Sequence, residues 1–181
     1  AHYELLEQAR QVASEAGHLR VAFEAAEKLA KVYRVDELAL QCDSVAAAID
    51  ATTPVAARTE SVKLAIDVAE ELLAQDRFQE AAKLINDLQT LARKGSDRDQ
   101  LDRINTLKQR GSDTYAAYRK AESAIESLKA DPKNEVAARM AGTYFAFAQG
   151  DWQLGLPMLA AGDDEALKAI AEAEMQVPNA G

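Results

Sequence analysis

Histidine and cysteine, which often serve as metal ligands and in catalysis, are rare in this sequence. They occur at His2, His18 and Cys42, too widely spaced for the close ligand pairs of a zinc site. His18 stands where a helix is expected to begin, and we interpret it as a solvent-facing turn residue. Cys42 has Leu40 and Val45 as neighbours, so we expect a small core residue rather than a reactive thiol.

Grouped carboxylates are the other residues whose spacing could indicate chemistry. They occur at Glu70-Glu71, at Asp97, Asp99 and Asp102, and at Asp163-Asp164-Glu165. The middle group lacks the glycine and the glutamate of an EF-hand loop, because Asp102 and Lys108 stand at those positions. Adjacent helical residues diverge by about 100°, so we interpret the other acids as solvated faces and helix caps. We therefore predict a protein that is not an enzyme and has no catalytic, cofactor-binding or metal-binding residues.

Aromatic residues form the remaining group of interest. Tyr115 and Tyr118 share a helical face, and Tyr144 and Phe147 precede Trp152, the only tryptophan. In one interpretation helices pack together here around a buried Trp152, and its replacement by alanine costs about 3–5 kcal/mol. In the other, part of this cluster lines a groove for a peptide or a sugar.

The overall composition indicates an all-α protein. Alanine, leucine, glutamate, lysine, glutamine and arginine dominate, whereas the 181 residues include 8 glycines and 4 prolines. The 30 acidic residues against 21 basic ones give a net charge of −9, which argues against a nucleic-acid partner. No apolar run approaches the roughly 18 residues of a membrane span, so we expect no membrane insertion.

Apolar residues recur at helical spacing along the whole chain. About nine helices are expected, at residues 3–16, 18–33, 37–51, 54–75, 77–94, 97–129, 135–149, 152–161 and 164–174. The expected N-caps are Asp36, Thr53, one of Ser96 and Asp97, Asn134, and one of Asp163 and Asp164. The inward faces expected in the first two helices are Leu5, Leu6, Ala9, Val12, Ala13 and Ala16, then Val21, Ala22, Ala25, Leu29 and Val32.

Two positions within these ranges could interrupt a helix. Gly111-Ser112-Asp113 resembles a helix boundary, but the apolar spacing from Leu101 to Leu128 passes through it without a change of phase. Because an interior glycine costs only about 1 kcal/mol relative to alanine, we predict one long helix. Pro157 is expected to kink or end its helix.

One short pattern occurs three times. Gly17, Asp76 and Gly150 are each followed by a large apolar residue two positions later and a small residue five positions later. The pairs are Leu19 and Ala22, Phe78 and Ala81, and Trp152 and Gly155. A tight turn between two helices needs an unusual φ at the turn, an apolar plug and a small residue at the closest contact. The pattern therefore predicts three helical hairpins.

This corner resembles the turn between the two helices of a tetratricopeptide (TPR) repeat. A second resemblance is to an uncharacterised α-helical region of large exported bacterial proteins. It is carried by Gly150-Asp151-Trp152, Gly155-Leu156-Pro157, Leu159, Gly162, Ala166-Leu167-Lys168, Ala171, Leu73-Ala74-Gln75-Asp76-Arg77-Phe78 and Ala81-Ala82-Lys83-Leu84. The resemblance implies a noncatalytic helical-repeat region of a larger, exported or envelope-associated protein.

We therefore expect one domain over residues 1–181, excised from a longer chain and folded as a TPR-like right-handed stack of antiparallel hairpins. Its expected role is a scaffold or spacer that positions neighbouring domains of the same chain. The alternative is an adaptor that binds a protein or peptide in a concave groove. For the adaptor, scattered candidates to bind a carboxylate are Lys83, Asn86 and Arg139.

Overall fold

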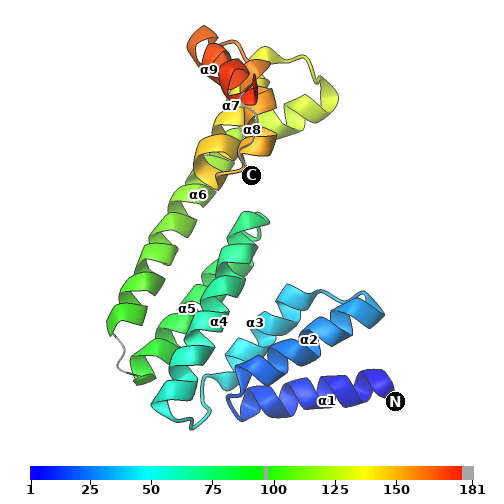
Figure 1. Cartoon of the computed structure of the whole chain (residues 1–181), viewed down its shortest axis with the longest axis vertical. Helices are drawn as coiled ribbons and strands as arrows, with labels where there is room; N and C mark the ends of the chain where they lie inside the picture. The colour runs from blue at the N-terminus through cyan, green and yellow to red at the C-terminus, as the bar shows by residue number, and fades with distance from the viewer. Residues whose placement is uncertain (96–97, 177–181) are drawn as a thin grey trace. The chain divides into compact units, whose positions relative to one another are not determined.

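Helices make up nearly all of the computed structural model, which describes residues 1–95 and 98–176 (Figure 1). Within those ranges there are nine α-helices, one π-helical segment and no strand. They are α1 (His2–Glu15), α2 (Leu19–Tyr33), α3 (Glu37–Ala48), α4 (Val55–Ala74), α5 (Phe78–Gly95), α6 (Arg98–Ala130), α7 (Glu135–Thr143), the π-helix η1 (Tyr144–Gln149), α8 (Trp152–Ala160) and α9 (Glu165–Gln176). The expected all-α class is confirmed.

The chain divides into two units, residues 1–111 and 112–181. The boundary falls inside α6, which passes from Gly111 to Ser112 without a break. The single long helix predicted through Gly111 is therefore confirmed over residues 98–130, while its predicted cap at Ser96 or Asp97 lies outside the described residues. The expectation of one domain over residues 1–181 stays a prediction.

The N-terminal unit is built from two hairpins, α1–α2 and α4–α5, with α3 packed against both. The core between them consists of aliphatic side chains at helical spacing, as their periodicity predicts. The largest fully buried ones are Leu19, Leu29, Val45, Val62, Leu72, Leu84, Leu88 and Ile104. The first part of α6 lies against α4, where Gln100 donates a hydrogen bond to the Thr59 carbonyl at 2.9 Å.

The three predicted turn residues all adopt a left-handed backbone conformation. The φ angles are +74° at Gly17, +58° at Asp76 and +77° at Gly150. Ala22 and Ala81 are fully buried, and a Cβ added at Gly155 would lie 2.6 Å from the backbone nitrogen of Ala146. The small residues therefore lie where each pair of helices is in contact, as predicted.

The apolar plug is confirmed at two corners and wrong at the third. Leu19 and Phe78 are buried, whereas Trp152 is 48% exposed. At the first two corners the residue after the turn donates its N–H to the carbonyl five positions earlier, as in His18 to Ala13 at 2.8 Å. At the third corner, Asp151 donates to Phe145, six positions earlier, at 2.8 Å.

The extra residue at the third corner comes from η1, whose wider turns replace the last part of the predicted helix 135–149. In this larger turn the Trp152 side chain is not packed against the preceding helical segment as Leu19 and Phe78 are. Trp152 packs instead at the surface, edge-on to Phe147, with ring centroids 5.3 Å apart and an interplanar angle of 88°. The interpretation of Trp152 as a buried cornerstone is therefore wrong.

Replacing Trp152 with alanine is expected to lower the free energy of unfolding by less than about 1 kcal/mol, since its ring is half exposed. Replacing the equivalent Leu19 should cost about 3 kcal/mol, because Leu19 is fully buried. Urea unfolding followed by circular dichroism compares the two variants. An equal loss for both would contradict the difference between these corners.

One other sequence expectation is corrected at the start of a helix, and the helix end expected at Pro157 is not observed. Pro54, rather than Thr53, occupies the N-cap position of α4, and no side chain caps this helix. Asp36 and Asn134 do cap as predicted, each accepting an N–H from the residue three positions later, at 3.1 and 3.0 Å. Asp164 accepts from Leu167 at 3.0 Å, and α8 continues three residues beyond Pro157.

The inward faces predicted for α1 and α2 are wrong at six positions, two of which are the exposed alanines Ala9 and Ala16. Leu5, Val12, Val21 and Val32 are more than half exposed. Arg10 instead faces the core, because its charge and donors are satisfied there: Glu7 accepts from Nε at 2.9 Å, and Nη1 donates to Ser44 Oγ and the Leu40 carbonyl at 2.9 and 3.1 Å.

Candidate functional site

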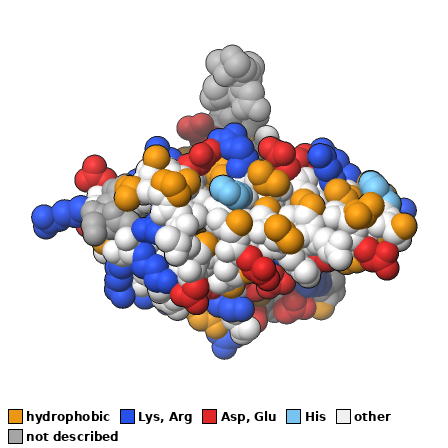
Figure 2. Space-filling view, turned by 90° about the horizontal axis from the view of Figure 1, so that it is seen from below, with side chains coloured by type: hydrophobic (Ala, Val, Ile, Leu, Met, Phe, Trp, Pro, Cys, Tyr) orange, Lys and Arg blue, Asp and Glu red, His pale blue; other side chains and the backbone are white. Residues whose placement is uncertain are grey.

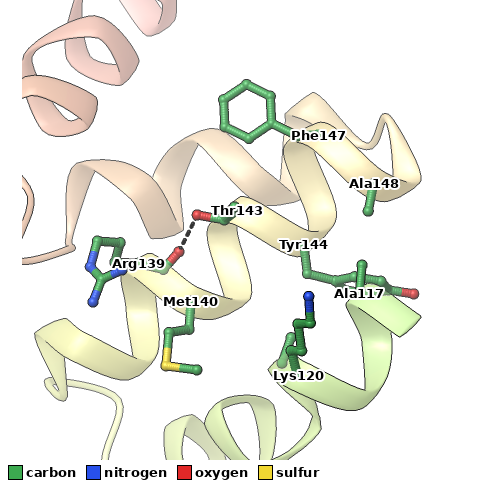
Figure 3. A pocket seen from close by; sticks show the side chains of 9 residues that line it. Ala117, Lys120, Arg139, Met140, Thr143, Tyr144, Phe147 and Ala148 are labelled. Carbon is green, nitrogen blue, oxygen red and sulfur yellow. Dashed lines mark hydrogen bonds between the residues drawn. The ribbon is translucent and has the colours of Figure 1, made fainter. Parts of the chain in front are cut away.

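A hollow of about 340 Å³ lies in the C-terminal unit between α6 and the α7–η1 segment, and we call it the α6/α7 groove (Figure 3). Three helical segments supply its walls, and apolar side chains predominate among them. The lining residues are Ala117, Lys120 and Ala121 from α6, Arg139, Met140 and Thr143 from α7, and Tyr144, Phe147 and Ala148 from η1. This volume suits one or two amino-acid side chains.

The π-helical geometry shapes one wall of the groove. Tyr144, Phe147 and Ala148 follow one another at intervals of three and one residues, and all three reach the groove. Gln149 donates a hydrogen bond to the Tyr144 hydroxyl at 2.9 Å and so ties the two ends of η1 together. Short π-helical segments are frequent at functional sites, which makes this wall a candidate for ligand contact.

Two cations line the groove, and they have different surroundings. Arg139 donates from Nε to Asp163 at 2.6 Å, and this contact lowers the pKa of the Asp163 carboxyl. The Lys120 ammonium has no hydrogen bond or ion pair with any residue that the structure describes. In Figure 3, Lys120 rises from α6 toward the α7–η1 wall. The lining residues that the structure describes include no carboxylate, so Lys120 is available to an anionic group of a ligand.

The lining also includes two flexible or polar side chains. Met140 points from α7 toward α6 in Figure 3 and can adapt to ligands of different shape. The Thr143 hydroxyl is engaged with the Arg139 carbonyl at 2.8 Å. The groove therefore offers mainly apolar contact, with few side-chain groups available for hydrogen bonds to a ligand.

The predicted aromatic cluster is divided between the groove and the surface. Tyr118 and Tyr144 pack with ring centroids 5.7 Å apart, and Tyr144 is buried. Phe147 stands at the rim, 58% exposed, and joins the groove to Trp152. Tyr115 is 44% exposed and does not line the groove. Of the aromatic residues singled out from the sequence, Tyr144 and Phe147 line the groove.

The other lining residues carry no distinctive sequence signal. Ala117, Lys120 and Ala121 are spaced as on any helix surface, and Met140 lies in an alanine-rich segment. Of the three residues predicted to bind a carboxylate, Arg139 lines the groove. Lys83 and Asn86 lie on α5 in the other unit, where Asn86 accepts a hydrogen bond from Lys108 at 3.1 Å.

Cys42 lies in a smaller hollow of about 100 Å³ between α3 and α5, together with Lys83 and Asp87. Burial raises the pKa of the Cys42 thiol to about 11 and also raises the pKa of Asp87. The thiol is therefore protonated at neutral pH and is a poor nucleophile. It is partly buried, somewhat more accessible than the core residue expected from the sequence.

No family model, curated protein or solved structure was found to match this chain. Across residues 1–95 and 98–176, no group of three or more histidine, cysteine, aspartate or glutamate side chains is placed to hold a metal ion. In the same ranges, none of the helices combines the length and apolar character needed to cross a membrane.

Proposed function

We propose that this chain is a noncatalytic helical module that binds a segment of a partner protein in the α6/α7 groove. The observation that carries the proposal is the combination of a mainly apolar hollow with a cation at its wall, Lys120, that has no ion pair among the described residues. A small apolar pocket with a few placed polar groups is the usual form of a ligand site. The expected scaffold role is compatible with it, since the partner can be a neighbouring domain of the same chain.

The chemistry of the lining favours a peptide with a bulky apolar side chain next to an aspartate or glutamate. The apolar side chain fills the space beside Ala117 and Met140, and the carboxylate reaches the Lys120 ammonium. A sugar is disfavoured, because it needs several hydrogen-bonding groups, whereas the Thr143 hydroxyl and the Arg139 Nε are already engaged. The hollow holds one such anchor, so we expect micromolar affinity.

A TPR-like arrangement of the hairpins belongs to the same proposal. It is supported by the three turns with positive φ at Gly17, Asp76 and Gly150 and by the buried small residues that follow the first two. In a TPR-like module the partner peptide lies on a face made by successive helices. The α6/α7 groove lies between α6 and the segments that follow it, α7 and η1.

A selection from displayed peptides, followed by titration of the chosen peptide, tests the proposal. Trp152 is the only tryptophan and contacts Phe147 at the groove rim, so its fluorescence should report binding directly. Lys120→Glu should weaken binding at least about tenfold by replacing attraction with repulsion. Ala117→Leu should weaken it similarly by filling the groove, because Ala117 lines it.

The matched control for charge is Lys133→Glu, which changes the charge of the same unit at an exposed position away from the groove. It should leave the affinity unchanged. If no peptide is selected, or if Lys133→Glu weakens binding as much as Lys120→Glu, the chain does not bind peptides in this groove. The spacer role without a peptide ligand would then be favoured.

A further inference from the structure

The outer face of α1 carries an apolar stripe that no described residue covers. Leu5 and Val12 are 63% and 66% exposed, and Ala9 and Ala16 are exposed between and after them. Figure 2 views the molecule from below the orientation of Figure 1, where α1 lies, and shows exposed hydrophobic side chains distributed over this face. We call Leu5, Ala9, Val12 and Ala16 the α1 stripe.

The exposure of the α1 stripe does not result from a poorly formed core. The opposite side of α1 faces the fold through Arg10, Ala13 and Ser14, which are all buried. Arg10 is held by Glu7 and Ser44, and the Ser14 hydroxyl donates to the Arg10 carbonyl at 2.7 Å. The helix thus buries satisfied polar groups beside Ala13 and leaves an apolar row exposed next to its polar outer face.

The spacing of the stripe fits a second helix. The intervals between Leu5, Ala9, Val12 and Ala16 are four, three and four residues, which is the a/d spacing of a helix–helix seam. Leucine and valine alternate with alanine, so an opposing helix can place its large side chains against the two alanines. An amphipathic helix therefore matches this surface better than an extended segment does.

The charges beside the stripe indicate which kind of helix binds. On one side of the α1 stripe, the helix surface carries four exposed polar residues, Glu4, Gln8, Gln11 and Glu15. The only arginine or lysine on α1 is Arg10, which is buried and bound to Glu7. An antiparallel pair of two copies would bring this acidic flank against its own copy, which is unfavourable. Lysine or arginine on the partner helix would complement it.

We propose that the α1 stripe is a docking surface for an amphipathic helix of a partner protein with basic residues beside its apolar face. This surface lies in the N-terminal unit and does not depend on the proposed groove. The helix lies along α1, with its apolar side chains over Leu5 and Val12. Its basic residues pair with Glu4 and Glu15.

The probe that tests this proposal is a synthetic helix of about four turns with leucines at a/d spacing and lysines on both flanks. Its partner probe has glutamate in place of every lysine. Calorimetric titration of the full chain should give at least about tenfold tighter binding of the lysine peptide. Leu5→Ser with Val12→Ser should abolish most of this binding, since both side chains are exposed and can be replaced without unfolding.

The matched control is Val21→Ser with Val32→Ser, which removes two valines of similar exposure from α2. This control should bind the lysine peptide as the unmodified chain does, and Glu4→Gln with Glu15→Gln should bind it more weakly. The proposal would be overturned if the two double-serine variants bound the lysine peptide equally well. It would also be overturned if the chain bound the two peptides equally, or bound neither. A dimer of the chain that dissociates in the Leu5/Val12 pair would overturn it by assigning the stripe to a second copy.

Discussion

Replacing Gly155 with alanine is expected to destabilise the C-terminal unit by about 3 kcal/mol or more. An added Cβ would lie 2.6 Å from the backbone nitrogen of Ala146 and 2.7 Å from its Cβ. Because the obstructing atoms include the backbone of η1, no side-chain rotation relieves the clash, and α8 must move away. Urea unfolding followed by Trp152 fluorescence measures this loss within the same unit.

Gly150→Ala is the control for this prediction, because it introduces the same methyl group only five residues away. Gly150 has φ +77° and no atom within 4 Å of an added Cβ, so the cost is that of the backbone conformation alone, about 1 kcal/mol. If Gly155→Ala unfolds at the same urea concentration as Gly150→Ala, the close contact between α8 and η1 is contradicted.

Removing the negative charge of Glu7 is expected to destabilise the N-terminal unit by about 3 kcal/mol, because the buried Arg10 loses the carboxylate that is bonded to it. The side chains of Arg10 and Glu7 are 8% and 22% exposed, and their closest contact is 2.5 Å. Glu7→Gln keeps the shape of the side chain and is the variant to measure, by urea unfolding with circular dichroism. Glu27→Gln, which disrupts an exposed pair with Lys31, should leave the midpoint unchanged.

The pH dependence of the same variant gives a second readout. The hydrogen bond and charge of Arg10 lower the pKa of Glu7 from its usual value of 4.5. A lowered pKa in the folded state means that the stabilisation is present above pH 4.5 and is lost as the pH falls through the lower, folded-state value. The difference between the unmodified chain and Glu7→Gln should therefore be constant near neutral pH and shrink in acid. A difference that grows below pH 4.5 would contradict the pair.

The helices and turns were predictable because their signals are local. Positive φ at Gly17, Asp76 and Gly150 follows from the residue types at helix ends, and continuity through Gly111 follows from the phase of the apolar residues. The exposure of Trp152 was not predictable from the corner spacing. It depends on the π-helical segment η1, which adds one residue to the turn without changing the sequence pattern after it.

The inward face of α1 and most of the groove depend on contacts between distant residues. Arg10 enters the core because Leu40 and Ser44, more than 29 residues away in the chain, accept its hydrogen bonds. The spacing of apolar residues alone predicts that an arginine in α1 faces solvent. In the groove, Tyr144 and Phe147 could be named as aromatic residues, whereas Lys120 and Met140 gain their significance from the packing of α6 against α7.

The most direct test of the proposed groove is a charge exchange between Lys120 and the selected peptide. Titrations pair the unmodified chain and Lys120→Glu with the acidic peptide and with a version carrying lysine in place of its acid. The proposal predicts that each chain binds the peptide of opposite charge at least about tenfold more tightly. If both chains bind the two peptides with the same preference, Lys120 does not contact the ligand and the groove is not the binding site.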